Sequence, residues 1–240
     1  MKKQNIIFMS VGIEFLIILS IAIAASFNGG VSFAVFYNGI YGLILSTIIP
    51  FYLVIKNNEN FSSLGIKRLG NRQIIILLFF VVLSIGGQVI PKLIAGENIE
   101  WNKLPICILP LIMTTFFEEF LFRGFFQTRI EKQYGSIIAI LISATMFSLY
   151  HLGYPGFRTV EDILLLLAVG TGFSIAFKLS DNNLIVSYLI NLPNAFITYI
   201  LKSEQFPTFT EESSTYAGLS IMMIIIVFLF VRRKIIAKIA

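Results

Sequence analysis

Long apolar runs separated by short polar segments make up nearly the whole chain. About 20 apolar residues in a helix are enough to cross a hydrocarbon core of roughly 30 Å. By this measure the sequence predicts an all-α, polytopic integral membrane protein with about eight transmembrane helices, residues 1–240 forming a single membrane domain. The expected spans are about 5–25, 33–55, 73–91, 105–128, 136–152, 161–179, 183–201 and 216–236.

Basic residues are distributed unevenly between the two sets of connecting segments. The side that holds the N-terminus collects Lys2, Lys3, Lys56, Lys67, Arg68, Arg72, Arg129, Lys132, Lys178, Arg232, Arg233, Lys234 and Lys238. The opposite side holds Lys92, Lys103, Arg158 and Lys202. Cytoplasmic loops of membrane proteins carry the excess of lysine and arginine, so both termini are predicted to be cytoplasmic.

The composition agrees with this topology. Hydrophobic residues make up 57% of the chain and charged residues 13%, against about 25% charged residues in soluble domains. The net charge of +5 lies in short clusters beside apolar spans, which indicates a lipid bilayer as partner and no nucleic acid. Abundant Ile, Asn and Lys is typical of AT-rich bacteria, so we expect a multi-pass protein of the bacterial plasma membrane.

Ionisable residues inside the apolar runs are the strongest indication of function. The stretch from Thr114 to Arg129 places Glu118, Glu119 and Arg123 among Phe and Leu. A charge at the bilayer centre costs a few kcal/mol or more, and such residues usually mark functional sites. Glu119 and Arg123 are four residues apart and suit an ion pair, which leaves Glu118 unexplained. Glu14, in the first span, is expected to face other helices, protonated or paired, with its role open.

Polar residues of three spans reach similar depths. Helical rise from the cytoplasmic ends puts Glu118 about 16 Å deep, His151 about 20 Å, and Asn191 and Asn194 about 12 to 16 Å. We therefore predict that these side chains meet in one site within the membrane.

A buried carboxyl group is a credible general base for activating water. His151 would protonate a leaving amine or hold the water, and Asn191 or Asn194 would donate amide hydrogens to an oxyanion. Arg123 would keep Glu119 ionised and fix the helix face. The predicted catalytic residues are Glu118, Glu119, His151, Asn191 and Asn194.

Two motifs resemble a known family. Glu118-Glu119-x-x-x-Arg123, followed by Phe147-x-x-x-His151 on the next span, resembles the first two motifs of the CPBP family, which comprises CAAX proteases and bacteriocin-processing enzymes and is also called the Abi family. The resemblance covers about residues 105–201. It implies an intramembrane endopeptidase of the metalloprotease type, with Arg123 and Phe147 in support and a hydrophobic or lipidated peptide as substrate. Among bacterial relatives it also implies peptide maturation or bacteriocin immunity.

The third motif of that family departs from the pattern. It has a His followed four residues later by Asn or Asp, and one alignment puts Asn191 and Ala195 there, the other Ser187 and Asn191. The second His is absent in both. A divalent metal such as zinc would then have only Glu118, Glu119, His151 and an amide as ligands, a poor set for zinc. A water activated by glutamate and His is therefore favoured over a tightly bound metal.

Two other functions stay open at this point. The missing His favours a catalytically reduced family member that acts as a peptide-binding, immunity or scaffold membrane protein. Carboxylates and His in membrane cores also form proton relays, as in a proton-coupled transporter. No inverted repeat of broken helices is visible in the sequence, which counts against the transporter.

Overall fold

The described part of the chain is all helical. The computed structural model describes residues 3–27, 29–97, 99–202, 206 and 209–239, and these contain no strand; Lys2, assigned above to the cytoplasmic side, lies outside them. In chain order the helices are α1 (Lys3–Ala25), α2 (Gly30–Ala34), η1 (Val35–Ile48), α3 (Ile49–Lys56), η2 (Phe61–Leu64), α4 (Asn71–Ile94), η3 (Trp101–Lys103), α5 (Leu104–Glu118), η4 (Glu119–Gln127), α6 (Thr128–Tyr134), α7 (Ser136–Leu149), η5 (Tyr150–Gly153), α8 (Val160–Leu179), α9 (Leu184–Leu201) and α10 (Glu211–Ile239).

The predicted fold class and the eight spans are confirmed. Eight stretches of the described residues are long and apolar enough to cross a membrane: Ile6–Ala25, Gly30–Lys56, Asn71–Ile94, Trp101–Tyr134, Ser136–Gly153, Val160–Leu179, Leu184–Leu201 and Glu211–Lys234. The fourth differs most from its predicted bounds. It runs on through the polar helix α6, because polar residues continue a helix beyond the apolar run from which the span was counted.

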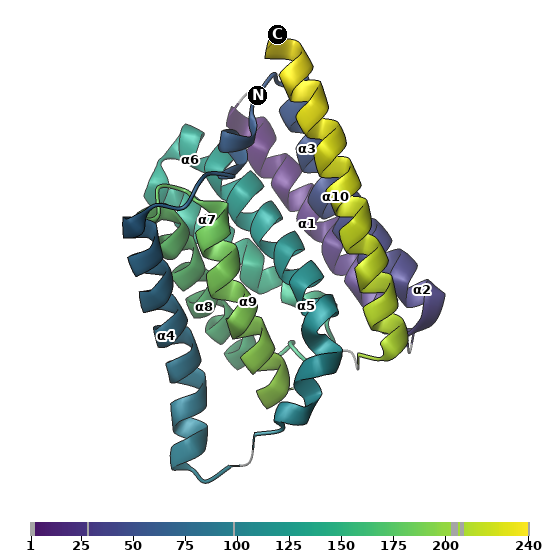
Figure 1. Cartoon of the computed structure of the whole chain (residues 1–240), viewed down its shortest axis with the longest axis vertical. Coiled ribbons are helices and arrows are strands. Elements are labelled where there is room, and N and C mark those ends of the chain that lie inside the picture. Colours follow the sequence, from purple (N-terminus) through teal and green to yellow (C-terminus); the bar gives the residue numbers. More distant parts are fainter. Residues whose placement is uncertain (1–2, 28, 98, 203–205, 207–208, 240) are drawn as a thin grey trace.

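The two ends of the chain lie at the same end of the helical bundle (Figure 1). An even number of spans requires this arrangement. In Figure 1, α4 stands at one edge of the bundle and α10 runs along the other side. The cytoplasmic location of the termini stays a prediction.

The fourth span forms the centre of the bundle. All nine residues of η4 are buried, whereas α4 buries none of its residues. Both η4 and η1 are π-helical, with hydrogen bonds from residue i to i+5, a geometry that is rare and frequent at functional sites. The change from α to π geometry falls between Glu118 and Glu119.

Gly42 lets η1 approach α5 closely. A Cβ atom at this position would lie 1.9 Å from Cε2 of Phe117, far inside van der Waals contact. We expect Gly42→Ala to lower the free energy of unfolding by about 1–3 kcal/mol, because overpacking forces the ring or the backbone to move. Thermal unfolding in detergent measures the effect. Gly12→Ala is the matched control, since a Cβ there meets no atom within 4 Å; an equal loss in both variants would contradict the steric explanation.

Candidate active site

The polar residues of the separate spans line one cavity. It has a volume of about 480 Å³ and lies between α4, α5, α7, η5, α8 and α9. Four of the five predicted catalytic residues are on its wall: Glu118, His151, Asn191 and Asn194. The depth count from the sequence thus identified side chains that the fold brings together.

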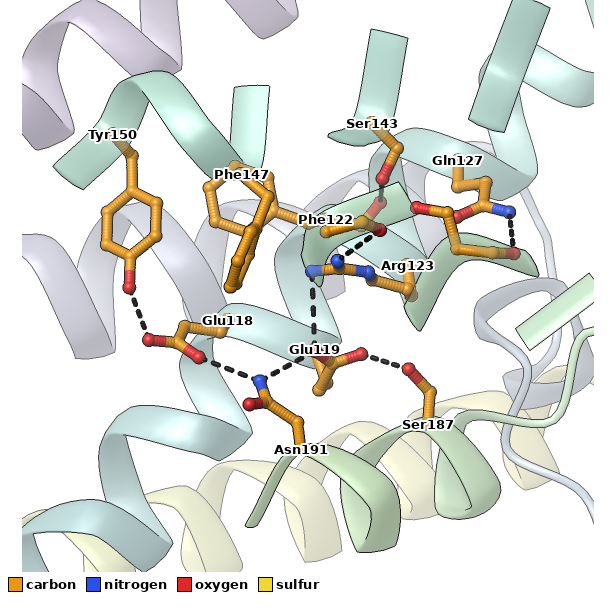
Figure 2. A network of polar contacts seen from close by, with 12 residues as sticks. Glu118, Glu119, Phe122, Arg123, Gln127, Ser143, Phe147, Tyr150, Ser187 and Asn191 are labelled. Atoms are coloured by element: carbon orange, nitrogen blue, oxygen red, sulfur yellow. Dashed lines mark hydrogen bonds and ion pairs between the residues drawn. The ribbon is translucent and has the colours of Figure 1, made fainter. Parts of the chain in front are cut away.

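Glu118 is the carboxyl group that faces this cavity. The Tyr150 hydroxyl donates to Oε1 of Glu118, and Nδ2 of Asn191 donates to Oε2 at 2.8 Å. Figure 2 shows the carboxylate between these two donors, one from η5 and one from α9. Only 7% of Glu118 is exposed. Its orientation is therefore fixed from two neighbouring helices while the group stays at the cavity wall.

Glu119 points into a different environment. It is fully buried and is not among the described residues that line the cavity. The Ser187 hydroxyl donates to Oε2, Nδ2 of Asn191 donates to Oε1 at 2.8 Å, and NH1 of Arg123 lies 3.3 Å from the same Oε1. The two adjacent glutamates thus have different surroundings, and Asn191 bridges them (Figure 2).

Arg123 pairs with Glu119 and is not among the described residues that line the cavity. It is fully buried, and NH2 donates to the carbonyl oxygen of Gly170 at 3.0 Å. Its guanidinium carbon lies 4.4 Å from the centroid of the Phe147 ring, where a cation is attracted by the face of the ring. A Cβ at position 170 would lie 2.8 Å from Phe147. Gly170 therefore allows α8 to approach α7 closely, where it presents a carbonyl to the arginine.

His151 lies in the short helix η5 directly after Tyr150. Its Nδ1 atom is 2.8 Å from the carbonyl oxygen of Phe147. A carbonyl can only accept a hydrogen bond, so Nδ1 carries the proton and the neutral ring has Nε2 as a free acceptor. Within the described part of the chain, no hydrogen bond joins His151 to Glu118 or Glu119. His151 and Glu118 are linked through Tyr150, whose hydroxyl donates to Glu118 and whose ring centroid is 4.1 Å from that of His151.

Asn194 has a different orientation from Asn191. Its Oδ1 accepts hydrogen bonds from Ser84 at 2.6 Å and from Gln88 at 2.7 Å, both on α4. Three residues along an α-helix leave the side chain one turn away and rotated by about 60°, so Asn194 reaches the cavity wall beside α4. Of the two alignments of the third motif, the geometry favours the one with Ser187 and Asn191, because these two contact the glutamates.

Asn191→Leu is expected to lower the free energy of unfolding by about 3–6 kcal/mol, since hydrogen bonds to charged groups contribute about 1.5–3 kcal/mol each and two are lost. Thermal unfolding in detergent checks this. Tyr188→Phe, one turn earlier on α9, is the control; it removes a single hydroxyl contact of 3.3 Å to the carbonyl of Ile112 and should change stability little. Equal stability of Asn191→Leu and wild type would exclude Asn191 as the group that holds the two carboxylates.

Sequence reasoning missed three tyrosines of the site. The Tyr150 hydroxyl donates to Glu118. The Tyr37 hydroxyl contacts the hydroxyls of Tyr154 at 2.7 Å and of Thr114 at 3.2 Å. The cavity is lined by all of Tyr37, Thr114, Tyr150 and Tyr154, as it is by Glu118. Tyr150 precedes His151 in the second motif, and this position was the available signal. Tyrosine is common in apolar helices, so its identity alone does not indicate a site.

The donor set does not fit a zinc site. Among the described residues, no three His, Cys, Asp or Glu side chains gather in a way that could hold a metal ion. Both oxygens of Glu118 accept bonds from Tyr150 and Asn191, and Glu119 is paired with Arg123. Zinc prefers imidazole and thiolate ligands in a tetrahedral arrangement, and this chain has one His. The residues of this site therefore favour hydrolysis without a bound metal.

The fold and the cavity define a class: a polytopic helical membrane protein with a carboxyl group and an imidazole on the wall of an intramembrane cavity. Residues 100–197 match the family model described as type II CAAX prenyl endopeptidase Rce1-like. This confirms the predicted resemblance to the CAAX proteases, and the matched residues hold every predicted site residue. Residues 100–197 of the chain are thus similar to the type II CAAX prenyl endopeptidases. No curated protein and no solved structure matched the chain.

Proposed function

We propose that this protein is an intramembrane endopeptidase that hydrolyses a peptide bond of a hydrophobic or lipidated peptide, with Glu118 as the group that activates water. The observation that supports this best is the placement of Glu118. It is a carboxyl group at the wall of a cavity of about 480 Å³, deep in a membrane protein, and oriented by Tyr150 and Asn191. A positioned general base contributes about 10²–10⁴-fold to the rate of such a reaction.

In the proposed mechanism, Glu118 takes a proton from a water molecule as the water oxygen adds to the peptide carbonyl carbon. Nε2 of His151 accepts the second hydrogen of this water and holds it in place, which suits the free acceptor at this atom. Glu118 then returns its proton to the leaving nitrogen, and the C–N bond breaks to give a carboxylic acid and an amine; the acid proton then passes to the amine, which leaves a carboxylate and an ammonium group. The water is consumed, and Glu118 ends in its starting state.

The two asparagines have separate roles in this proposal. Both N–H groups of Asn191 are occupied by the glutamates, so we assign Asn191 to positioning the carboxylates. Asn194 has its oxygen fixed by α4, and we assign its NH2 group to the oxyanion. Donors fixed before the reaction stabilise developing charge without reorganisation.

Apolar side chains of the cavity support a hydrophobic substrate. Its wall includes aliphatic and aromatic residues of α5, α8 and the segments near the bundle end, among them Leu111, Phe157, Leu165, Leu166, Val169 and Phe206. α4, which closes one side, has no buried residue and contacts α9 through the polar bonds of Asn194 and Thr198. The apolar residues of the cavity wall favour a substrate with an apolar chain, such as a lipidated peptide.

Purified protein incubated with a library of lipidated and hydrophobic peptides tests the function. We expect cleavage by wild type, loss of cleavage in Glu118→Ala and a strong decrease in His151→Ala, with both variants folded. Cleavage should persist after dialysis against a chelator, with no stoichiometric metal in the sample, because the donor set does not fit zinc. Loss of activity in the chelator, restored by zinc, would contradict the metal-free mechanism.

The absent second His supports an alternative. In that case the protein is a catalytically reduced relative that binds a peptide or a membrane partner through the same cavity. Wild type would then bind members of the library and cleave none of them. Binding that is lost on filling the cavity with Ala195→Trp, without cleavage by wild type, would favour this alternative over the endopeptidase.

A further inference from the structure

A second buried carboxyl group lies outside the candidate active site. Glu14 of α1 is 6% exposed, and neither of its carboxyl oxygens has a hydrogen-bond partner among the described residues. The buried hydroxyls of Ser10 and Ser46 are in the same state within that part of the chain. The hydroxyl of Tyr41 also has no partner at hydrogen-bond distance and angle there, although it interacts with Tyr150. The proposed mechanism uses none of these groups.

The four side chains come from one stretch of the contact between α1 and η1. The hydroxyl of Ser20 donates to the carbonyl of Phe36 at 2.7 Å, which fixes the level at which these helices meet. The helices run in opposite directions, so moving back along α1 corresponds to moving forward along η1. Going back along α1 from that contact leads to Ser10, and going forward along η1 leads to Ser46. Glu14 falls in between, beside Tyr41, with which it interacts electrostatically.

Buried polar groups in native proteins are nearly always satisfied, by protein atoms or by ordered water. Buried water occupies sites where several polar atoms converge, and a charged carboxylate without a counter-ion is unfavourable in a membrane core. Two carboxyl oxygens and three hydroxyls between two helices meet this requirement. An apolar residue at position 14 would let α1 pack on η1 without burying a carboxyl group. The presence of Glu14 therefore indicates that a polar molecule lies between the two helices.

Tyr41 connects this cluster to the candidate active site. Its ring is stacked on that of Tyr150, with 6.2 Å between the ring centroids, and the Tyr150 hydroxyl donates to Glu118. Tyr41 is not among the described residues that line the cavity. Ser10, Glu14 and Ser46 are not among them either, whereas Tyr150 is, so Tyr150 contacts both Tyr41 and the cavity.

We infer that Ser10, Glu14, Tyr41 and Ser46 form an internal water site, and that this site supplies water to Glu118 past Tyr41 and Tyr150. The second part rests on the proposed function: each hydrolysis consumes one water molecule, and a peptide that fills the cavity blocks access from that side. Water held behind Tyr150 reaches the carboxyl group while the substrate is bound.

Radiolytic hydroxyl-radical footprinting of the purified protein tests the water site without any need for activity. Bound water is converted to radicals in place, so a buried aromatic residue beside it is oxidised. We expect Tyr41 to be oxidised several-fold faster than Phe51, which is as deeply buried, also packs against aromatic rings and is not part of the cluster. Glu14→Leu should reduce the rate at Tyr41 to that of Phe51, and Glu14→Gln, which keeps the polar atoms, should not.

The same variants test the supply of water. Glu14→Leu should lower kcat for peptide cleavage several-fold with KM unchanged, and Glu14→Gln should remain near wild type. Protection of Tyr41 equal to that of Phe51 in wild type would overturn the water site, and normal kcat in a Glu14→Leu protein that has lost the Tyr41 signal would overturn its supply role. If Glu14→Leu does not fold, Ser46→Ala takes its place. If no protein cleaves, wild type included, the proposed function fails while the footprint still decides the water site.

Discussion

Replacing Glu118 by Gln should lower kcat for peptide cleavage by about 10²–10⁴-fold, the contribution of a positioned general base. Glutamine keeps the shape of the side chain: its oxygen can accept from Nδ2 of Asn191 while its NH2 group donates to the Tyr150 hydroxyl, but it cannot take a proton from water. KM should change little, because the cavity walls stay in place. Steady-state kinetics on purified protein, with the unfolding temperature measured on the same sample, checks both expectations.

Glu119→Gln is the matched control for this result, since it makes the same chemical change one residue away. Glu119 has its contacts with Ser187, Asn191 and Arg123 and is not one of the described cavity residues. We expect this variant to lose stability and to keep a much larger share of kcat than Glu118→Gln. Equal loss of kcat in two well-folded variants would show that the glutamates act as a unit, and the division of roles proposed here would be wrong.

The positions of the spans and the convergence of Glu118, His151 and Asn191 could be predicted from the sequence. Apolar runs in a bilayer must form helices that satisfy their own backbone, and helical rise is constant, so position along a span gives depth. Depth was enough to place these three residues at one level. The family motifs then indicated which chemistry these three residues would support together.

The different surroundings of Glu118 and Glu119 could not be predicted from the sequence. Adjacent residues differ by about 100° around a helix, but which of them faces a cavity depends on the packing of α7, α8 and α9. The family motif contains both glutamates and does not distinguish their roles. In the structure, Ser187 and Arg123 contact only Glu119, and Tyr150 contacts only Glu118.

The orientation of Asn194 and the role of Tyr150 depend on tertiary contacts in the same way. Asn194 was predicted at the same depth as the carboxylates, and it lines the same cavity as Glu118. Its direction is set by Ser84 and Gln88 of α4, a helix far away in the sequence. Tyr150 is placed over Glu118 by the turn of η5, and no periodicity in the sequence indicates that turn.

Loss of the Arg123 charge should lower the stability of the protein strongly. Arg123→Met keeps much of the side-chain volume but leaves Glu119 fully buried without its counter-ion. Breaking a buried pair by removing one partner costs about 3–5 kcal/mol, because an uncompensated charge remains. The contacts with the Gly170 carbonyl and the Phe147 ring are lost as well. Equilibrium unfolding in mixed micelles measures the change.

The double variant Arg123→Met with Glu119→Gln separates charge from packing. Replacing both members of a buried ion pair is often nearly neutral, so the double variant should recover most of the stability that Arg123→Met loses. A double variant as unstable as Arg123→Met would show that the arginine acts mainly through Gly170 and Phe147, and that it holds α8 against α7. Recovery of stability together with substantial cleavage would place the ion pair in support of the fold and leave Glu118 as the carboxyl group required for hydrolysis.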